Sequence, residues 1–399
     1  MVASFVLSIL NIAAIVTGEE FSNIHDTEID RFLKKINKPA LKSIKSPNGD
    51  IICVHMKNHP IYDHPLFKNH TIQMKPSSYF KRWNNESSKA LKKSIVTQMW
   101  TIYGECPNNS IPIRRTKKED ILRTGSLEKY LKKYPNNILR LNQANPIDNY
   151  THEYAILRLN GNFHGAQAVI NVWKPYLQTP REFSLTQTWL LAGPYGETNT
   201  IEFGWQAYPQ RYGDDNPRLF IYWTADMYNQ TGCYNLECPG FVPVNRAFAL
   251  GEPVTPVSTM NGQQYHIPMA VWKDPRSGNW WLKVDNHIFV GYWPSTLFNH
   301  LRNGVTEIQW GGEIINLKEN SQHTTTTMGS GHFAREGYGR ASYFRNLQIF
   351  DENGIWKPIN GGYPHMTNKN CYDIKTGYEK IIWGNYFYYG GPGRNQLCI

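Results

Sequence analysis

The chain has 399 residues, of which 40% are hydrophobic, and it carries a formal net charge of +10 at pH 7. A chain of this length can bury a full core, and we expect one large domain with an accessory segment. Its lysines and arginines are scattered, with no dense arginine stripe and no RNA-reading motif, so the composition argues against a nucleic-acid-binding protein.

The first residues of the chain predict a signal peptide over residues 1–18. An apolar stretch from Val2 to Val16 is followed by Gly18, so that small side chains occupy the positions minus three and minus one of a cleavage site. The stretch is too short for a membrane-spanning helix, and no later run approaches about 18 consecutive apolar residues. We therefore expect a soluble, exported protein without membrane contact, located outside the cell or in an acidic vacuolar lumen.

Export makes the six cysteines candidates for disulfide bonds. Six cysteines allow many connectivities, and proximity in the sequence favours Cys53 with Cys106, Cys233 with Cys238, and Cys371 with Cys398. This pairing leaves no free thiol. Sequons for N-glycosylation agree with a secretory route, and they begin at Asn69, Asn85, Asn108, Asn149 and Asn229.

Charge divides the chain into two unlike parts. Residues 152–399 contain 19 Lys+Arg and 19 Asp+Glu, so their net charge is zero; residues 1–151 hold the other 23 basic and 13 acidic residues, and thus the whole excess of +10. A detachable basic segment that neutralises an acidic cleft explains this split. We therefore expect the segment 19–150 to lie in that cleft and to inhibit the later domain.

The N-terminal third has mixed structure. In HDTEIDRFLKKINKPALKSI the apolar residues between Ile29 and Ile36 follow the spacing i, i+3, i+4 and i+7, which predicts one amphipathic helix that begins at Asp26 or Thr27 and ends before Pro39. Short apolar runs punctuated by prolines follow and predict strands. The Asn- and Pro-rich run at the end of the segment, up to residue 150, indicates a domain boundary and a linker. We expect a small α+β domain here.

From residue 151 on, the sequence predicts an all-β domain. Short β-branched and aromatic runs recur at intervals of about 10–15 residues between glycine, proline and asparagine turns, which is typical of an antiparallel β-sandwich. The candidate strands are YAILRLNG, GAQAVINVWKP, FSLTQTWLLAG, NTIEFGWQAYP, RLFIYWTAD, QYHIPMAVWKD, NWWLKVDN, HIFVGYWP and TEIQWGGEII. The segment from Pro294 to Leu301 is the one short helix expected in this domain.

The sequence lacks the motifs that several kinds of catalytic chemistry require. The sequence has no Gly-x-Ser-x-Gly nucleophile elbow, and GSGH at residues 329–332 does not supply one. It has no His-Glu-x-x-His zinc motif, and we expect no metal and no other cofactor. A thiol nucleophile is not expected if all six cysteines are paired. Carboxylates remain as candidates.

Two glutamates stand out by their position on predicted strands. In NTIEFGWQAYP, alternation places Glu202 on the face opposite the apolar residues, next to a glycine; in TEIQWGGEII, Glu313 has the same setting after two glycines. One hypothesis is that the glycines leave room for a substrate backbone beside each acid. The other is that both glutamates lie on a solvated face and the glycines mark bulges.

The motifs resemble the plant neprosin family over most of the chain, from about residue 25 to the C-terminus. GDIICVHMKNHPIYDHPLFKNHTIQMKPS is similar to the family's activation peptide, and FSLTQTWLLAG, TIEFGWQAYP, RLFIYWTADMYNQTGCYNLECPGFV, WWLKVDNHIFVGYWPSTLF, QWGGEII and MGSGHFAREGYGRASYFRNLQ are similar to blocks of its protease domain. The resemblance implies an activation peptide over residues 19–150 and a β-sandwich peptidase domain over residues 151–399. It also implies a glutamic endopeptidase, made as a proenzyme, that cleaves after proline at acidic pH.

The family's two catalytic glutamates fall on Glu202 and Glu313, motif by motif. Two close carboxyl groups share a proton near acidic pH, so one can act as a base on water while the other protonates the scissile carbonyl; the sequence does not assign these roles. Gln206, on the face of Glu202, is a candidate for stabilising the oxyanion or orienting the water. Tyr222 and Trp310 are candidate ring faces for a substrate proline, although such aromatics are more often core residues. Glu307 is a third acid near Glu313.

Two other functions fit the same pattern of strands and acids. A secreted, aromatic-rich β-sandwich is also the architecture of a non-catalytic module that binds carbohydrate or cell wall. Paired carboxylates also serve glycosidases. The two glutamates in matching motifs argue against the first, and the family resemblance alone argues against the second.

Overall fold

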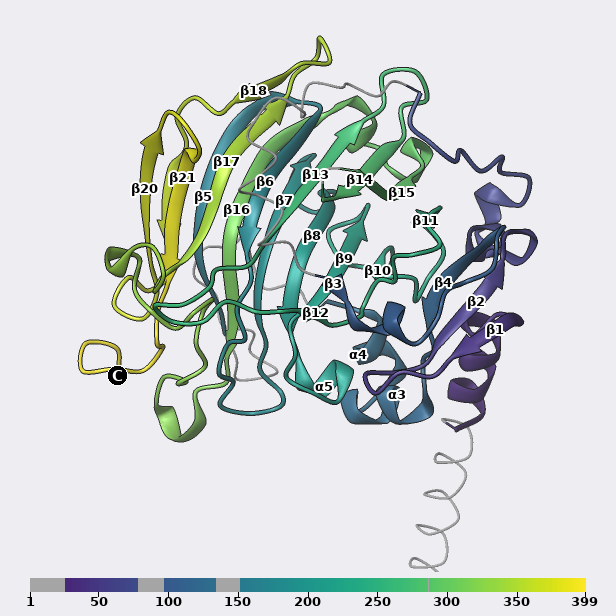
Figure 1. Ribbon diagram of the computed structural model, residues 1–399, viewed down its shortest axis with the longest axis horizontal. Helices are drawn as coiled ribbons and strands as arrows, with labels where there is room; N and C mark the ends of the chain where they lie inside the picture. The colour runs from purple at the N-terminus through teal and green to yellow at the C-terminus, as the bar shows by residue number, and fades with distance from the viewer. Residues whose placement is uncertain (1–25, 78–96, 134–150, 286) are drawn as a thin grey trace, which may run out of the picture.

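Figure 1 shows two large β-sheets that lie face to face, with a smaller N-terminal part at one side. The structure is a computed structural model that describes residues 26–77, 97–133 and 151–399, apart from residue 286. The strands of both large sheets pair in antiparallel fashion. The predicted antiparallel β-sandwich is confirmed.

The first sheet has seven strands in the order β10-β9-β8-β7-β16-β5-β19. Their bounds are β5 Thr151–Phe163, β7 Ser184–Ala192, β8 Asn199–Ala207, β9 Arg218–Thr224, β10 Cys233–Tyr234, β16 Val305–Asn316 and β19 Tyr363–Met366. Strand β7 lies between β8 and β16, the two strands that carry the predicted catalytic glutamates. Residues far apart in the sequence thus become neighbours in the middle of this sheet.

The second sheet has nine strands, with the order β11-β15-β14-β13-β6-β17-β21-β20 and β18 paired to β17. Their bounds are β6 Gly165–Asn171, β11 Val242–Pro243, β13 His266–Lys273, β14 Trp280–Val284, β15 Ile288–Trp293, β17 Ser342–Phe350, β18 Trp356–Pro358, β20 Asp373–Glu379 and β21 Gly384–Gly390. This sheet forms the back of the sandwich.

The main core lies between the two sheets and follows the alternation of the strands. Ile201, Phe203 and Trp205 of β8 point into it, as the pattern predicts, and so do Ile308 and Trp310 of β16. These side chains are 0% exposed. The alternate residues of both strands, including Glu202 and Glu313, must therefore lie on the opposite, outer face of the first sheet.

That outer face carries a second apolar cluster, which we call the outer-face cluster. Its buried members are Tyr154, Ile156, Phe183, Leu185, Trp189, Leu191, Phe220, Tyr222, Tyr234 and Ile315. An antiparallel sheet commonly exposes one polar face to water, so an apolar outer face needs a cover or a ligand. Here the N-terminal part supplies a cover, since the main-chain N–H of Lys133 donates to the hydroxyl of Tyr222 over 3.3 Å.

The N-terminal part has the expected α+β composition. The predicted helix is confirmed over residues 26–36. A three-stranded sheet follows in the order β1-β2-β4, with helices α3 and α4 after it. The bounds are β1 Ala40–Ile44, β2 Ile51–His55, β4 Ser110–Arg114, α3 Lys118–Thr124 and α4 Leu127–Leu131. A short strand β3, Thr97–Gln98, pairs with β12, Val254–Thr255, and so ties this part to the sandwich.

A proline-rich segment extends the N-terminal part over the second sheet. It forms three 3₁₀ helices, Met56–Asn58, Pro60–Asp63 and Pro65–Phe67. The side chains of Ile61 and Phe67 pack in one apolar cluster with Trp281 and Tyr292 of the sandwich. The N-terminal part thus contacts the outer faces of both sheets.

All three predicted disulfides are present, and the chain has no free cysteine. Cys53–Cys106 lies within the N-terminal part; the other two lie within the sandwich. Pairing by proximity therefore gave the right connectivity, and no disulfide crosses between the two parts.

The segment from Pro294 to Leu301 does not form the single short helix that was predicted. The segment holds a 3₁₀ helix at Ser295–Leu297 and meets a second one at Leu301–Asn303, because Pro294 and the extended Phe298 interrupt any longer helix. The four-residue helix α5, Pro209–Tyr212, was not predicted.

Two other predictions fall on residues that the structure does not describe. The signal peptide over residues 1–18 and most of the expected linker up to residue 150 lie outside the described ranges. No helix in those ranges is long and apolar enough to span a bilayer.

Candidate functional site

The two predicted catalytic glutamates lie on the same face of the first sheet, on either side of β7. Glu202 of β8 is opposite Trp189 of β7, and Glu313 of β16 is opposite Leu185. Gln187 lies between those two β7 residues on the same face. Both carboxyl groups are almost completely buried, with 0% and 1% of the residues exposed.

One lysine of the N-terminal part joins the two carboxylates. The ammonium nitrogen of Lys133 lies 2.7 Å from Oε2 of Glu202 and 3.1 Å from Oε2 of Glu313. Only 4% of the lysine side chain is exposed. Lys133 lies two residues after the end of helix α4, so the position of this helix places a cation at the centre of the site. A buried cation that bridges two buried acids is the electrostatic partner that the charge split predicts.

The remaining oxygen of each glutamate is held by the sandwich itself. Oε1 of Glu202 accepts hydrogen bonds from the hydroxyls of Tyr228, at 2.5 Å, and Thr200, at 3.0 Å. Oε1 of Glu313 lies 2.5 Å from Nδ1 of His152 and accepts from the hydroxyl of Tyr154 at 3.3 Å. Each carboxylate therefore has a fixed outer oxygen and an inner oxygen that faces Lys133.

The ionisation of the site follows from these contacts. Burial raises the pKa of Glu313, but the Lys133 ammonium and the His152 contact lower it more, and the net pKa lies below its usual value. Burial lowers the pKa of Lys133, but the charges of Glu202 and Glu313 more than reverse this, so its pKa is raised. The closed site therefore places the charged Lys133 between the two carboxyl groups, with Glu313 in the ionised form.

The glutamine beside the site is Gln187 and not Gln206, the glutamine that the sequence predicts there. Nε2 of Gln187 donates to Oε2 of Glu202 over 3.1 Å. The predicted Gln206 lies on the same face but donates to the hydroxyl of Tyr212 over 2.9 Å. Gln206 therefore holds the side chain of Tyr212 in place. Alternation along FSLTQTW does place Gln187 on one face of its strand, but only the strand order shows that β7 lies between the glutamates.

The two predicted ring contacts have different outcomes. Tyr222 of β9 lies on the outer face opposite Glu202 in the strand register, and its ring is 5.7 Å from that of Tyr228. This position suits a substrate contact. Trp310 is buried in the core between the sheets, on the other side of β16 from Glu313. That position contradicts its predicted contact with a substrate.

The two glycines before Glu313 have separate structural reasons. Gly311 has a φ of +151°, and an added Cβ would lie 2.3 Å from the carbonyl oxygen of Ala155 on the neighbouring strand. An added Cβ on Gly312 would lie 2.6 Å from Met328 in the core. Gly311 is also opposite Gln187, whose other neighbour in the register is Gly204. Glycines therefore flank the central glutamine on both sides in the strand register.

The third acid of this face, Glu307, is neutralised separately. Its carboxylate lies 2.5 Å from Nε of Arg158 on β5 and also accepts from Nε2 of Gln309 over 2.9 Å. It lies six residues along β16 from Glu313. The described contacts therefore give Glu307 no direct part in the pair.

A cavity of about 460 Å³ lies on the outer face, next to the Lys133 and His152 side chains that contact the glutamates. Lys133 and His152 lie at its inner end. The aromatic and aliphatic residues of its wall belong to the sandwich: Phe183, Tyr208, Tyr234, Ile315 and Leu317. Its rim carries Lys129 and Lys132 of the N-terminal part and Arg181, Lys318 and Glu319 of the sandwich. An apolar groove that leads to buried polar groups is the usual form of a binding site.

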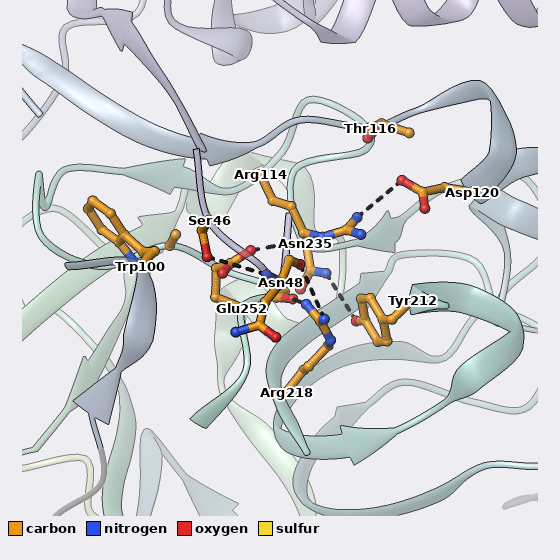
Figure 2. A network of polar contacts seen from close by, with 12 residues as sticks. Ser46, Asn48, Trp100, Arg114, Thr116, Asp120, Tyr212, Arg218, Asn235 and Glu252 are labelled. Carbon is orange, nitrogen blue, oxygen red and sulfur yellow. Dashed lines mark hydrogen bonds and ion pairs between the residues drawn. The ribbon is translucent and has the colours of Figure 1, made fainter. Parts of the chain in front are cut away.

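A second polar network anchors the N-terminal part beside the site (Figure 2). Arg114 of β4 forms an ion pair with Asp120 over 3.3 Å, and its Nε lies 3.9 Å from Oε1 of Glu252 in the sandwich. In the opposite direction, Arg218 of β9 donates to the main-chain oxygen of Asn48 over 3.3 Å. Each part thus sends an arginine toward the other.

Glu252 is the weakly satisfied member of this network, and its replacement by glutamine is expected to stabilise the proenzyme at pH 8. It is 1% exposed, and neither carboxylate oxygen accepts a hydrogen bond from the described residues. Burial raises its pKa to about 7, despite the nearby Arg218 and Arg114. Because the folded pKa is raised, the folded state loses stability as the pH rises from about 4.5 to about 7 and beyond, by up to about 3 kcal/mol.

Thermal unfolding of the full-length protein at pH 5 and pH 8 measures this effect. Glu252→Gln should raise the Tm at pH 8 and reduce the difference between the two pH values. The control is Glu237→Gln, because Glu237 is also buried but is paired with Arg211; its loss should lower the Tm at both pH values. An unchanged pH difference in Glu252→Gln would contradict the prediction.

Together these features define a hydrolase-like arrangement: an antiparallel β-sandwich whose paired buried carboxylates are covered by a basic N-terminal part. Comparison with known families matches residues 180–392 to the family described as Neprosin, and residues 43–158 to the Neprosin activation peptide. The chain therefore belongs to the neprosin family. It is a peptidase made with an N-terminal activation peptide.

Solved structures of glutamic peptidases are similar to this chain at low levels. A scytalido-glutamic peptidase with a peptide-based transition-state analog is 12% identical, with 62% of this chain and 98% of that chain covered and a TM-score of 0.33. SCP-B, described as a member of the Eqolisin family in a complex with the tripeptide Ala-Ile-His, is 12% identical with the same coverage and a TM-score of 0.31. These TM-scores are too low to decide the chemistry, so it is argued from the chain's own residues.

Proposed function

We propose that the chain is the proenzyme of an exported glutamic endopeptidase, with Glu202 and Glu313 as its catalytic residues. The single observation that carries this proposal is the Lys133 ammonium, which lies within 3.1 Å of both carboxylates. One group can reach both acids only if the acids are close enough to act on the same bond. Residues 19–150 then form the activation peptide, and residues 151–399 the peptidase domain.

Removal of Lys133 changes the charge state of the pair. With the cation present, the ionised form of Glu313 is favoured, because the Lys133 ammonium and the His152 contact outweigh the effect of burial on its pKa. Without it, two carboxyl groups remain close together in a buried site, and two such groups cannot both ionise easily. At acidic pH one then holds a proton and the other does not. This mixed state is the one that general acid–base hydrolysis requires.

Hydrolysis of a peptide bond then takes two steps. First, the ionised glutamate accepts a proton from a water molecule as the water oxygen bonds to the carbonyl carbon, and the protonated glutamate donates its proton to the carbonyl oxygen. Second, the C–N bond breaks while the first glutamate passes its proton to the leaving nitrogen and the second recovers one from a hydroxyl of the intermediate. Both carboxyl groups return to their initial states, so the cycle needs neither a covalent intermediate nor a cofactor.

Gln187 supports the first step by its position. Its Nε2 donates to Glu202, and both of its neighbours in the strand register are glycines. The amide thus lies on the strand between the two acids, where a donor stabilises the charge that develops on the carbonyl oxygen. We assign to Gln187 the role predicted for Gln206, which is to stabilise the oxyanion or to orient the water.

The preference for proline has support from the outer-face cluster. The ring of Trp189 faces the ammonium of Lys133 at 5.7 Å, and the ring of Tyr222 lies opposite Glu202 in the strand register. When the activation peptide leaves, flat apolar ring faces are available beside the acids. A pyrrolidine ring is compact and apolar and packs well on such faces.

Export is part of the proposal and has support from the cysteines. All six form disulfides, which persist in oxidising compartments and are rare in the cytosol. An extracellular space or an acidic vacuolar lumen also provides the acidic pH at which one carboxyl of the pair is protonated.

One assay separates this function from the two alternatives. The full-length protein is incubated at pH 3–7, and the product is given a proline-containing peptide, the same peptide with alanine in place of proline, and a panel of polysaccharides. The proposal expects peptide cleavage after proline below about pH 5 and no release of sugars. Release of sugars would identify a glycosidase, and binding to a polysaccharide without cleavage of any substrate would identify a carbohydrate-binding module.

A further inference from the structure

The two glutamates differ in the groups that hold their outer oxygens. Glu202 accepts from the hydroxyls of Tyr228 and Thr200, which are neutral donors. Glu313 contacts the imidazole of His152 at 2.5 Å and the hydroxyl of Tyr154 at 3.3 Å. Imidazole is the one group among these four that can carry a positive charge. The site is therefore electrically asymmetric even without Lys133.

Lys133 and His152 both contact Glu313, and in the sequence they lie on either side of the segment 134–150. Lys133 belongs to the activation peptide and contacts Oε2. His152 belongs to β5, where it is opposite Ile315 in the ladder with β16, and contacts Oε1. A cut within the segment 134–150 would free Lys133 to leave, while the strand pairing would keep His152 on the glutamate.

We propose that His152 is a positioning residue that holds Glu313 in the ionised form, so that Glu313 is the base and Glu202 is the acid of the reaction. This inference rests on the proposed function. Glu313 then takes the proton from the attacking water, and Glu202, held by neutral donors, carries the proton that goes to the carbonyl oxygen. His152 itself touches neither water nor substrate in this assignment.

Other charged groups around this corner of the site do not replace His152. Those nearest to Glu313 are Lys133, which leaves with the activation peptide, and Glu202, its partner in the pair. The cavity beside His152 contains Lys129, Lys132, Arg181, Lys318 and Glu319. The two lysines leave with the activation peptide, and Arg181 is paired with Glu319 over 3.3 Å at the exposed rim. Among the groups that remain once the activation peptide has left, His152 is the one in direct contact with a carboxylate oxygen of Glu313.

The dominant influences on Glu313 in the proenzyme agree with this assignment. Burial raises its pKa; Lys133 lowers it most among the neighbours, and the contact with His152 comes next. After Lys133 leaves, His152 is the larger remaining stabiliser of the ionised form. A base must be ionised to act, so the acid side of the pH–rate profile reports the pKa of Glu313.

The test compares His152→Phe and His152→Gln with the wild type. All are full-length chains with an added protease recognition site in the segment 134–150, so that each is cut in the same way. Phenylalanine removes the donor and the charge; glutamine keeps an N–H donor without the charge. We expect His152→Phe to lower kcat about 10–100-fold, to leave KM within about twofold, and to move the acid side of the profile to higher pH. His152→Gln should recover part of kcat.

His323→Gln is the matched control, because His323 is also buried and lies 2.9 Å from a buried glutamate, Glu153, away from the pair. It should leave the profile in place. Three results would overturn the inference: a profile that does not move in His152→Phe, an equal shift in His323→Gln, or a shift of the acid side in Tyr228→Phe instead. If either Glu202→Gln or Glu313→Gln keeps full activity, the proposed function itself is wrong, whatever His152 does.

Discussion

Glutamine in place of Glu202 or Glu313 is expected to lower peptidase activity by about 10²–10⁴-fold each, which is the usual contribution of a general acid or base. The amide can neither accept a proton from water nor return one to the leaving nitrogen. It keeps the size of the carboxyl group and part of its hydrogen bonding, so the Lys133, Tyr228 and Tyr154 contacts need little rearrangement. The sandwich should therefore fold, and the loss should appear in kcat.

Glu307→Gln is the matched control for this experiment. Glu307 lies on the same strand and the same face as Glu313 but is paired with Arg158. Its replacement should leave activity within about twofold, since its contacts are with Arg158 and Gln309 and not with either catalytic glutamate. EDTA and reagents directed at serine or thiol nucleophiles should leave the wild type active. Wild-type turnover in either Glu202→Gln or Glu313→Gln at pH 4 would end the glutamic-peptidase hypothesis.

The faces of the strands were predictable because the period of a β-strand is local. Ile201, Phe203 and Trp205 alternate with Glu202, and any pairing partner leaves that alternation intact. The same alternation places Trp310 with the core residues of β16, so the predicted contact of Trp310 with a substrate conflicts with the face of the strand on which it lies. Disulfide pairing was equally local, because each cysteine lies near its partner in the sequence.

The companions of the glutamates were not predictable, because they depend on strand order. Gln187 is a neighbour of the acids only because β7 lies between β8 and β16, strands that are about 110 residues apart in the sequence. His152 reaches Glu313 only because the first strand of the sandwich pairs with β16. A single sequence gives the faces of each strand but does not give which strands are adjacent. The residues around the two glutamates could therefore be identified only from the structure.

The charge split indicated which segment covers the glutamates but not which residue reaches them. Twenty-three basic residues precede position 152, and the one that enters the site is distinguished by what lies around it. Tyr130 of α4 packs at the sandwich, with its carbonyl accepting from Nη1 of Arg211 over 2.7 Å and its hydroxyl donating to Glu237 over 3.2 Å. This anchor fixes the end of α4 three residues before Lys133. The position of the cation is thus set by packing of its helix.

Replacement of Lys133 by methionine is expected to make the proenzyme activate at a higher pH than the wild type, by about one pH unit or more. Methionine fills the space but leaves two buried carboxylates without their cation, a change that costs about 3–5 kcal/mol when one partner of a buried pair is removed. The folded protein can relieve this cost by binding a proton or by releasing the activation peptide. Either outcome brings the site closer to its active state at neutral pH.

The sign of the wild-type response follows from the same contacts. The pKa of Glu313 is lowered in the closed proenzyme, so the stabilisation from its pairing is complete above the ordinary carboxyl pKa and is lost as the pH falls through the lowered one. The pKa of Lys133 is raised, so the lysine stays charged throughout this range. Acid therefore loosens the wild-type closure by protonating the carboxylates.

Lys132→Met is the matched control, since Lys132 is the preceding residue and its ammonium donates to the main-chain oxygen of Asn229, over 3.0 Å, at the exposed rim. Full-length wild type and both variants are incubated across pH 3–7, and the cut form and the peptide turnover are followed together. The midpoint of activation should move toward neutral pH in Lys133→Met and stay in place in Lys132→Met. If the midpoint is the same in all three, the closure does not depend on the cation between the glutamates, and the activation peptide must inhibit through its bulk alone.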